Sequence, residues 1–233
     1  MIRIVNARDV YSNLEFPAAK EGRPYCFINM VTTIDGKILS GSRNEPVLDL
    51  GSKIDHMLMK RIESCADAVL VGAQTLRTTL PTWKPAPHTR IVVSISGDLP
   101  YEASFFQGDG SYVATCETAA FEPKHGAQVI RAGAKKVDFP RLMRRLRDEL
   151  GIQRLLVLGG SELNAQLLSA NLVDELFVTI APKVKLGRDV PTYADGDALS
   201  REDLQHYSLI EHHAIADEVF IRYRRRGNTP GAT

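Results

Sequence analysis

The sequence of 233 residues contains three cysteines and no CxxC pair. Cys26, Cys65 and Cys116 lie far apart, and the six histidines have no ligand spacing with them. This pattern gives no disulfide framework and argues against a zinc site. We therefore expect reduced thiols, no bound metal and a cytoplasmic location.

A long apolar segment and a strong net charge are also missing. Residues 1–24 carry several charged side chains and no apolar run, so we expect neither a signal peptide nor a transmembrane segment. The formal net charge is +1, and the basic run from Lys135 to Arg147 has no interleaved aromatic residues. Such a run is typical of a solvated helix face. Neither a nucleic acid nor a membrane is an expected partner.

The common nucleotide-binding motifs are absent as well. No GxGxxG follows an expected strand, and no GxxxxGK followed by Ser or Thr occurs. What the chain does contain is an alternation of apolar runs with helical patterns. The expected strands are Tyr25–Thr33, Ala66–Val71, Arg90–Ile95, Ser111–Thr115, Gln128–Arg131, Leu155–Leu158, Asp174–Ile180, His206–His213 and Val219–Arg224.

The alternation predicts an α/β fold with a mostly parallel central sheet and helices on both faces. The last two strands predict a C-terminal antiparallel hairpin. Ser52 is typical of a helix N-cap, and Asp55 three residues later would complete a capping box. We expect a single domain over residues 25–224, an N-terminal extension over residues 1–24 and a flexible tail over residues 225–233.

Four loops follow strands at the edge where open α/β sheets bind ligands. They are Ile34–Lys37, Gly72–Thr75, the segment with Ser94 and Ser96, and Gly159–Ser161. In the last, a glycine pair separates a buried strand from a helix N-terminus, which suits a phosphate. An ordinary tight turn is the alternative interpretation.

Asp35 and Lys37 are the only charged pair directly after a buried strand. The carboxylate suits a substrate amine or a proton transfer, and the ammonium suits a phosphate or a hydroxyl. The alternative is that Asp35 only shapes the Asp-Gly turn. Both interpretations stay open on the residues alone.

Three motifs, in the same order, resemble the riboflavin-biosynthesis pyrimidine reductases. They are NMVTTIDGK over residues 29–37, ADAVLVGAQTLRTTLP over 66–81, and the segment 155–187 with LVDELFVTIAPKVKLG. The resemblance implies a dihydrofolate-reductase-like fold, NADPH as cofactor and a homodimer. It also implies reduction of 5-amino-6-(5-phosphoribosylamino)uracil, or of the related diaminopyrimidinone, by hydride transfer to a ring-opened imine.

The resemblance also implies roles for individual residues. On the substrate side it places Asn29 and Thr33, together with Asp35 and Lys37 as catalytic candidates. The residues implied to hold the cofactor are Gly72, Thr75, Arg77, Ser94, Gly159, Gly160, Ser161, Glu162 and Leu163. Ser94 matches a position near the 2′-phosphate of the adenosine ribose, which favours NADPH over NADH.

Two motifs depart from those of the family. Leu158 precedes the glycine pair where Glu is common, and Thr79-Leu80-Pro81 replaces a common Asp-Asp-Pro. These departures motivate an alternative, a reductase of the same fold that acts on dihydrofolate or another pterin-like or imine compound. A non-catalytic nucleotide-binding module is a further alternative. The zinc deaminase motifs of bifunctional relatives are absent from the sequence, so we expect a stand-alone reductase.

Replacing Asp35 by Asn tests its catalytic role. If the carboxylate stabilises a protonated imine, the variant loses turnover by orders of magnitude, because the negative charge is gone. NADPH affinity should stay nearly unchanged. Steady-state kinetics and a cofactor titration check both parts, and unaltered turnover would leave Asp35 only its role in the turn.

Overall fold

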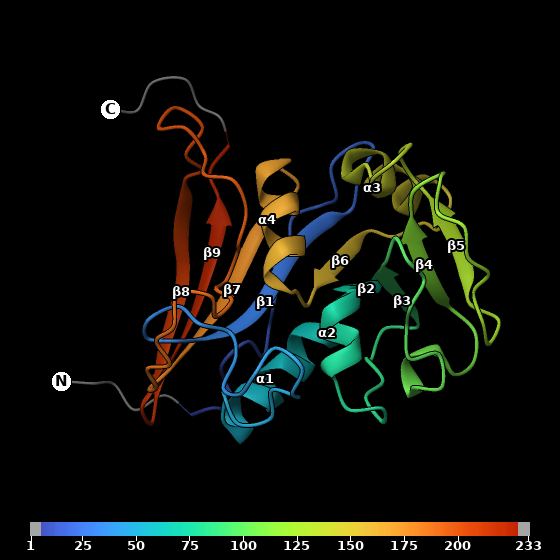
Figure 1. The fold of residues 1–233 in the computed structure, drawn as a ribbon. Coiled ribbons are helices and arrows are strands. Elements are labelled where there is room, and N and C mark those ends of the chain that lie inside the picture. Colours follow the sequence, from blue (N-terminus) through green and yellow to red (C-terminus); the bar gives the residue numbers. More distant parts are fainter. Residues whose placement is uncertain (1–5, 228–233) are drawn as a thin grey trace.

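The computed structural model describes residues 6–227 and is built around one nine-stranded sheet with the order β5-β4-β3-β2-β6-β1-β7-β9-β8 (Figure 1). From β5 to β7 all neighbours are parallel, and β9 and β8 add antiparallel strands beside β7. The strands are β1 (Tyr25–Thr33), β2 (Ala68–Gly72), β3 (Thr89–Val93), β4 (Ser111–Thr115), β5 (Gln128–Arg131), β6 (Arg154–Val157), β7 (Glu175–Ala181), β8 (Tyr207–Ile215) and β9 (Glu218–Arg225). The predicted fold class and its antiparallel hairpin are confirmed.

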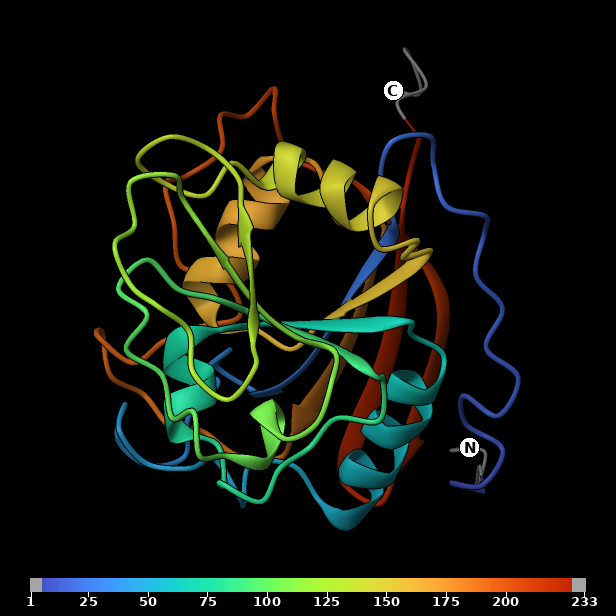
Figure 2. The ribbon, with the colours of Figure 1, turned by 90° about the vertical axis from the view of Figure 1, so that its right-hand side faces the viewer.

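Helices cover both faces of the sheet, as predicted. Figure 2 shows α3 and α4 on one side and α1 and α2 on the other. Their bounds are α1 (Lys53–Ser64), α2 (Ala73–Thr78), α3 (Phe139–Asp148) and α4 (Ser161–Ser169), and a short 3-10 helix, η1, spans Ser104–Phe106. None of the helices within residues 6–227 is long and apolar enough to cross a membrane.

Two apolar clusters form the core, one on each face of the sheet. Successive residues of a strand point to opposite faces, so Ile28 joins the cluster under α3 and α4 while Phe27 joins the cluster over α1. Leu146 of α3 and Leu58 of α1 are each almost fully buried in these clusters. Burial of one such leucine contributes about 1.5–3 kcal/mol. The central strands therefore fix the positions of the loops at their ends.

Helix α1 begins at the predicted N-cap, Ser52, but Asp55 is not the second residue of a capping box, as the sequence predicted. The Ser52 hydroxyl accepts hydrogen bonds from the backbone N–H groups of Ile54 and Asp55. The backbone N–H of Ser52, however, donates to the Glu218 carboxylate at 2.8 Å. Because Glu218 at the start of β9 supplies this bond, the Asp55 side chain takes no part in the cap.

The N-terminal segment contributes to the core although residues 6–24 form no helix or strand. Val10 and Tyr11 are buried, and the Tyr11 ring packs edge-on against Phe177 at 5.3 Å between centroids. Arg61 of α1 donates to the carbonyl oxygen of Ala7 at 3.0 Å and fixes the segment to the helix. The first five residues of the predicted extension, and residues 228–233 of the predicted tail, lie outside the described residues.

A buried ion-pair cluster joins β1, β7 and β9. Glu175 is fully buried and accepts hydrogen bonds from the Nε atoms of Arg222 at 2.6 Å and Arg224 at 2.7 Å. The Tyr25 hydroxyl donates to the same carboxylate at 2.7 Å. The Arg222 guanidinium also lies over the Phe16 ring, 5.0 Å from its centroid. The cluster thus connects the antiparallel edge to the parallel core.

Replacing Glu175 by Ala should lower the free energy of unfolding by about 3–5 kcal/mol, because it leaves Arg222 buried without its main carboxylate. Denaturation in urea measures the change. Glu149→Ala is the matched control, since Glu149 pairs with Arg145 at the surface of α3 and its loss should change stability little. Equal effects of the two substitutions would contradict this account.

Candidate functional site

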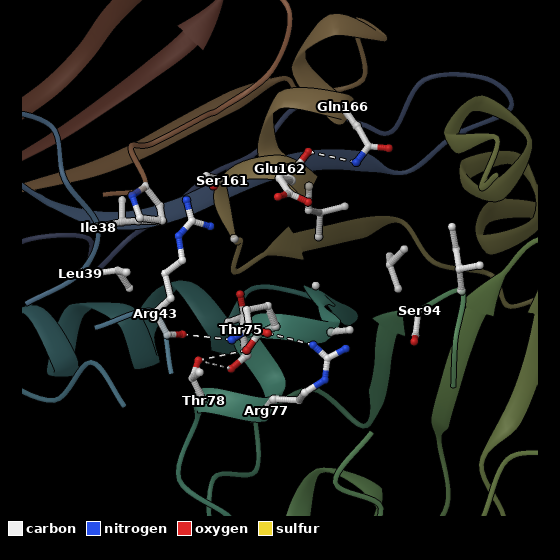
Figure 3. A pocket seen from close by; sticks show the side chains of 18 of the residues that line it. Ile38, Leu39, Arg43, Thr75, Arg77, Thr78, Ser94, Ser161, Glu162 and Gln166 are labelled. Atoms are coloured by element: carbon white, nitrogen blue, oxygen red, sulfur yellow. Dashed lines mark hydrogen bonds between the residues drawn. The ribbon is translucent and has the colours of Figure 1, made fainter. Parts of the chain in front are cut away.

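Four adjacent parallel strands, β3, β2, β6 and β1, end at one edge of the sheet, beside a cavity of about 740 Å³ (Figure 3). We refer to it as the first cavity. Its walls come from the loop after β1, from α2, from the end of β3 and from the start of α4. Ligands of open α/β sheets bind at this edge, because the strand ends present loops rather than side-chain layers there.

Most of the residues expected to hold a cofactor lie around the first cavity. The residues of that set that line it are Gly72, Thr75, Arg77, Ser94, Gly160, Ser161, Glu162 and Leu163. Gly159 does not line it. Its carbonyl oxygen instead accepts a hydrogen bond from the backbone N–H of Gly72 at 2.7 Å, which joins the β2 and β6 loops.

Helix α4 begins at the wall of the first cavity. Its N-cap, Gly160, has no side chain that could bond to the first turn. The backbone N–H groups of that turn therefore have no partner within the helix, and the helix dipole favours negative charge beside them. A Cβ atom on Gly160 would lie 3.2 Å from Thr75 Oγ1, so glycine keeps this close approach open. The arrangement can bind an anion such as a phosphate.

Arg77 and Ser94 lie toward the β3 end of the first cavity (Figure 3). The Arg77 Nε donates to the carbonyl oxygen of Asp98 at 3.1 Å, and its Nη1 donates to Gln74 Oε1 at 2.9 Å. The buried Ser94 hydroxyl accepts from the Gly97 N–H at 3.1 Å and can donate its own hydrogen. A guanidinium and a hydroxyl donor suit a second anionic group.

Arg43 and Asn44 also line the first cavity, although none of the sequence motifs singled them out. Arg43 Nη2 donates to the carbonyl oxygen of Asp189 at 3.0 Å. Gln74 Nε2 donates to the Arg43 carbonyl oxygen at 3.0 Å, which ties the loop to α2. Arg43 lies in the loop that follows β1 at this edge of the sheet, and a basic residue in such a loop is a sequence signal that could have identified it as a lining residue.

A second cavity, of about 350 Å³, adjoins the first and shares Ile38, Leu39, Thr75, Thr78 and Gly160 with it. Its other walls are mainly apolar: Met30, Val31, Pro46, Val47, Leu48, Leu50, Met59, Leu80, Trp83 and Leu158. Leu158, Thr79 and Leu80, the residues that depart from the family motifs, all line this second cavity. Asn29, which was predicted on the substrate side, lines it too, and its contact with a substrate stays a prediction.

Asp55 and His56 are polar residues of the second cavity that sequence reasoning did not assign to a site. Asp55 is only 8% exposed, and its pKa is raised above the ordinary value because burial disfavours the charged form. The hydroxyl of Thr179 counteracts this effect, while the nearby Glu218 carboxylate adds to it. Within residues 6–227, no three acidic, histidine or cysteine side chains come together in a way that could hold a metal ion.

Thr33, Asp35 and Lys37 line neither cavity. The Asp35 carboxylate accepts from the Thr33 hydroxyl at 2.6 Å and from the backbone N–H groups of Lys185 at 3.1 Å and Leu186 at 2.8 Å. The hydrogen bond from Thr33 is the main reason why the pKa of Asp35 is lowered to about 2, and the backbone hydrogen bonds contribute to the same effect. Lys37 Nζ donates to the Val190 carbonyl oxygen at 3.0 Å. These contacts connect the β1 turn to residues 185–190, and a catalytic role for the pair stays a prediction.

Comparison with protein families matches residues 24–221 to the RibD C-terminal domain. The chain is 29% identical to the 2,5-diamino-6-ribosylamino-4(3H)-pyrimidinone 5′-phosphate reductase of Methanothermobacter thermautotrophicus, over 88% of this chain and 100% of that protein. It is 28% identical to the enzyme of the same name from Aquifex aeolicus, over 86% of this chain and 96% of that protein.

Solved structures support the same fold. RibD of Acinetobacter baumannii superposes with a TM-score of 0.73 at 16% identity, over 89% of this chain and 59% of that longer chain. A dihydrofolate reductase from Enterococcus faecalis, complexed with NADP(H), gives a TM-score of 0.55 at 13% identity, over 90% of this chain and 99% of the other. The fold is therefore dihydrofolate-reductase-like, as the motifs implied.

Gly159→Ala should perturb the second cavity. Gly159 has φ +82°, so alanine there costs about 1–2 kcal/mol of stability. Its Cβ would lie 2.4 Å from Met30 Cε, so the methionine tip must move. Trp83, the only tryptophan, lines that cavity and should report the change in its fluorescence.

Gly151→Ala is the matched control, because Gly151 has φ +68° but no atom within 4 Å of an added Cβ. It should lose similar stability without a change in Trp83 emission. The same emission spectrum in both variants would show that Met30 does not transmit the substitution to the second cavity.

Proposed function

The chain belongs to the RibD C-terminal domain family, and from this membership we propose that it is an NADPH-dependent reductase of riboflavin biosynthesis. Its substrate would be 5-amino-6-(5-phosphoribosylamino)uracil or the related diaminopyrimidinone. The named relatives reduce 2,5-diamino-6-ribosylamino-4(3H)-pyrimidinone 5′-phosphate, which supports a pyrimidine substrate.

One observation carries the proposal: a larger cavity with several charged and hydroxyl side chains meets a smaller, more apolar one at Thr75 and Gly160. The first offers an uncapped helix N-terminus, a guanidinium and a buried hydroxyl, which fit the phosphates of a dinucleotide. The second offers apolar walls for a flat ring. A hydride donor in the first cavity and an acceptor in the second would meet where the two join.

Different residues of the first cavity would bind different parts of the cofactor. We assign the pyrophosphate to the Gly159–Gly160 loop and the first turn of α4, from Ser161 to Leu163. Gly72 and Thr75 would flank it from β2 and α2. Arg77 and Ser94 would bind the 2′-phosphate of the ribose, and this contact would make the enzyme prefer NADPH to NADH.

The chemistry requires little from acid–base groups. The phosphoribosylamine opens to an imine at its anomeric carbon, and bound NADPH supplies the hydride that reduces this carbon. The chain's task is to exclude water and to align the two reactants. The Asp35 carboxylate is charged at neutral pH, and its lowered pKa makes it a still weaker proton donor, so it suits stabilisation of a cationic imine better than donation of a proton.

Asn29, Thr33 and Lys37 complete the substrate side of the proposal. Asn29 would hydrogen-bond the substrate directly from the second cavity. Thr33, Asp35 and Lys37 would act by holding residues 185–190 beside the site, and a direct contact with substrate requires that segment to move. By the resemblance we also propose a homodimer in the cytoplasm, which analytical ultracentrifugation and cell fractionation would check.

A second candidate function is reduction of dihydrofolate or another pterin-like compound by the same fold. The second cavity favours it, because none of the described residues that line this cavity is a lysine or an arginine. A phosphate ester would therefore have to lie outside it. Assays of NADPH oxidation with each substrate separate the two functions, and activity on dihydrofolate alone would overturn the first.

NADPH should raise the melting temperature of the protein, because a ligand that binds only the folded state stabilises it. Arg77→Met should weaken NADPH binding about tenfold or more, since it removes a charged hydrogen-bond partner of a phosphate. NADH binding should change little. Isothermal titration calorimetry measures the affinity for NADPH and for NADH in both proteins.

Arg144→Met is the matched control, because Arg144 is exposed on α3 and lines neither cavity. It should bind NADPH as the wild type does. No thermal shift and no heat of binding with NADPH in the wild type would refute both candidate functions together.

A further inference from the structure

Arg43 is a second cation at the wall of the first cavity, besides Arg77. It lies in the loop between β1 and α1, and in Figure 3 its side chain extends toward the start of α4 at Ser161. Among the described residues that line this cavity, Arg43 and Arg77 are the only cations and Glu162 is the only carboxylate. The cavity therefore has a positive group besides the one that would bind the 2′-phosphate.

The Arg43 guanidinium has no carboxylate partner within residues 6–227. The Glu45 carboxylate, in the same loop, accepts instead from the backbone N–H of Ser42 at 2.9 Å. Asp189 offers Arg43 only its carbonyl oxygen, at 3.0 Å from Nη2. A guanidinium carries further N–H groups, and these are available to a ligand.

Two contacts hold Arg43 at the cavity wall. Its carbonyl oxygen accepts from Gln74 Nε2 of α2 at 3.0 Å, and its Nη2 donates to Asp189 in the loop after β7. Both the backbone and the guanidinium therefore have a defined position. A charged side chain that is already in place loses less conformational freedom when it binds an anion, so more of the interaction energy appears as affinity.

The two arginines lie at different ends of the first cavity. A dinucleotide with a 2′-phosphate also has its negative charge in two places, the diphosphate and the 2′-phosphate. Arg77 lies with Ser94 toward the β3 end, whereas Arg43 lies toward the start of α4 (Figure 3). The first turn of α4 presents backbone N–H groups that have no partner within the helix. An anion at that turn would lie in the same part of the cavity as Arg43.

We propose that Arg43 binds the diphosphate of the cofactor, together with the first turn of α4. The assignment rests on the proposed reductase function and adds a residue to its cofactor site. Glu162 makes such a cation necessary, because its carboxylate belongs to that same first turn and would repel a diphosphate. The Arg43 guanidinium offsets this repulsion and can donate parallel hydrogen bonds to phosphate oxygens.

The test measures the affinities for NADPH and for NADH in the wild type and in Arg43→Met by isothermal titration calorimetry. Both cofactors carry the diphosphate, so the substitution should weaken both by about tenfold or more, the value of one charged hydrogen bond. Arg77→Met differs, since it should weaken NADPH alone. Arg43→Lys keeps the charge without the planar fork, and it should recover part of the loss.

Arg188→Met is the matched control. Arg188 is exposed in the loop after β7, next to the Asp189 that Arg43 contacts, and it lines neither cavity. This variant should bind both cofactors as the wild type does. Arg43 is exposed as well, so both variants should melt at nearly the wild-type temperature when no cofactor is present.

Unchanged affinity for both cofactors in Arg43→Met would overturn the assignment and leave the reductase function intact. A loss for NADPH alone would also overturn it, because Arg43 would then contact the 2′-phosphate. A higher KM for the phosphorylated pyrimidine, with unchanged cofactor affinity, would assign the guanidinium to the substrate instead. If the wild type binds neither NADPH nor NADH, the proposed function itself fails.

A measurement with NADPH alone covers the case in which NADH binds too weakly to be compared. In the double variant Arg43→Met/Arg77→Met, the two losses of NADPH affinity should multiply, because two separate phosphate groups each lose a contact. A combined loss no greater than the larger single loss would place both arginines at one phosphate and overturn the assignment.

Discussion

The hydrogen bond from the Gly72 N–H to the Gly159 carbonyl oxygen, at 2.7 Å, joins the two loops on which the candidate site depends. One loop ends β2 and begins α2, and the other ends β6 and begins α4. Such a bond contributes only about 0.5–1.5 kcal/mol of stability, so its importance is positional. It sets Gly160 and Thr75 side by side, and these two residues line both cavities. The junction between the two cavities thus follows from backbone contact between the loops that end two neighbouring strands.

The sheet order explains why this contact exists. Strand β6 lies between β1 and β2, so segments far apart in the sequence end beside one another. The parallel register places all these ends at one edge. Buried apolar residues on both faces hold the strands, and the ion-pair cluster around Glu175 holds the antiparallel edge. The packed core therefore stops at the strand ends, and the loops that follow form walls of the two cavities.

Local patterns were sufficient for the fold and for most of the first cavity. Strand β1 follows Pro24 and ends before an Asp-Gly turn, and the whole stretch between them is apolar enough to identify it. The loops expected to hold the cofactor have glycine or serine at a strand end, which is a local signal too. Asp35 was equally conspicuous, but the structure shows its carboxylate bonded to Lys185 and Leu186, far away in sequence. Sequence spacing carries no information about such a partner.

For Asp55, the local sequence pattern predicted a role in the helix cap that the structure does not show. In the sequence it occupies the third position after a serine N-cap, where an acid normally serves the helix end. That interpretation failed because Glu218 of β9 reaches Ser52 and takes over the bond. The Asp55 side chain instead forms a hydrogen bond with Thr179 of β7, beside the wall of the second cavity. Only the tertiary structure shows these partners, since Glu218 belongs to β9 and Thr179 to β7.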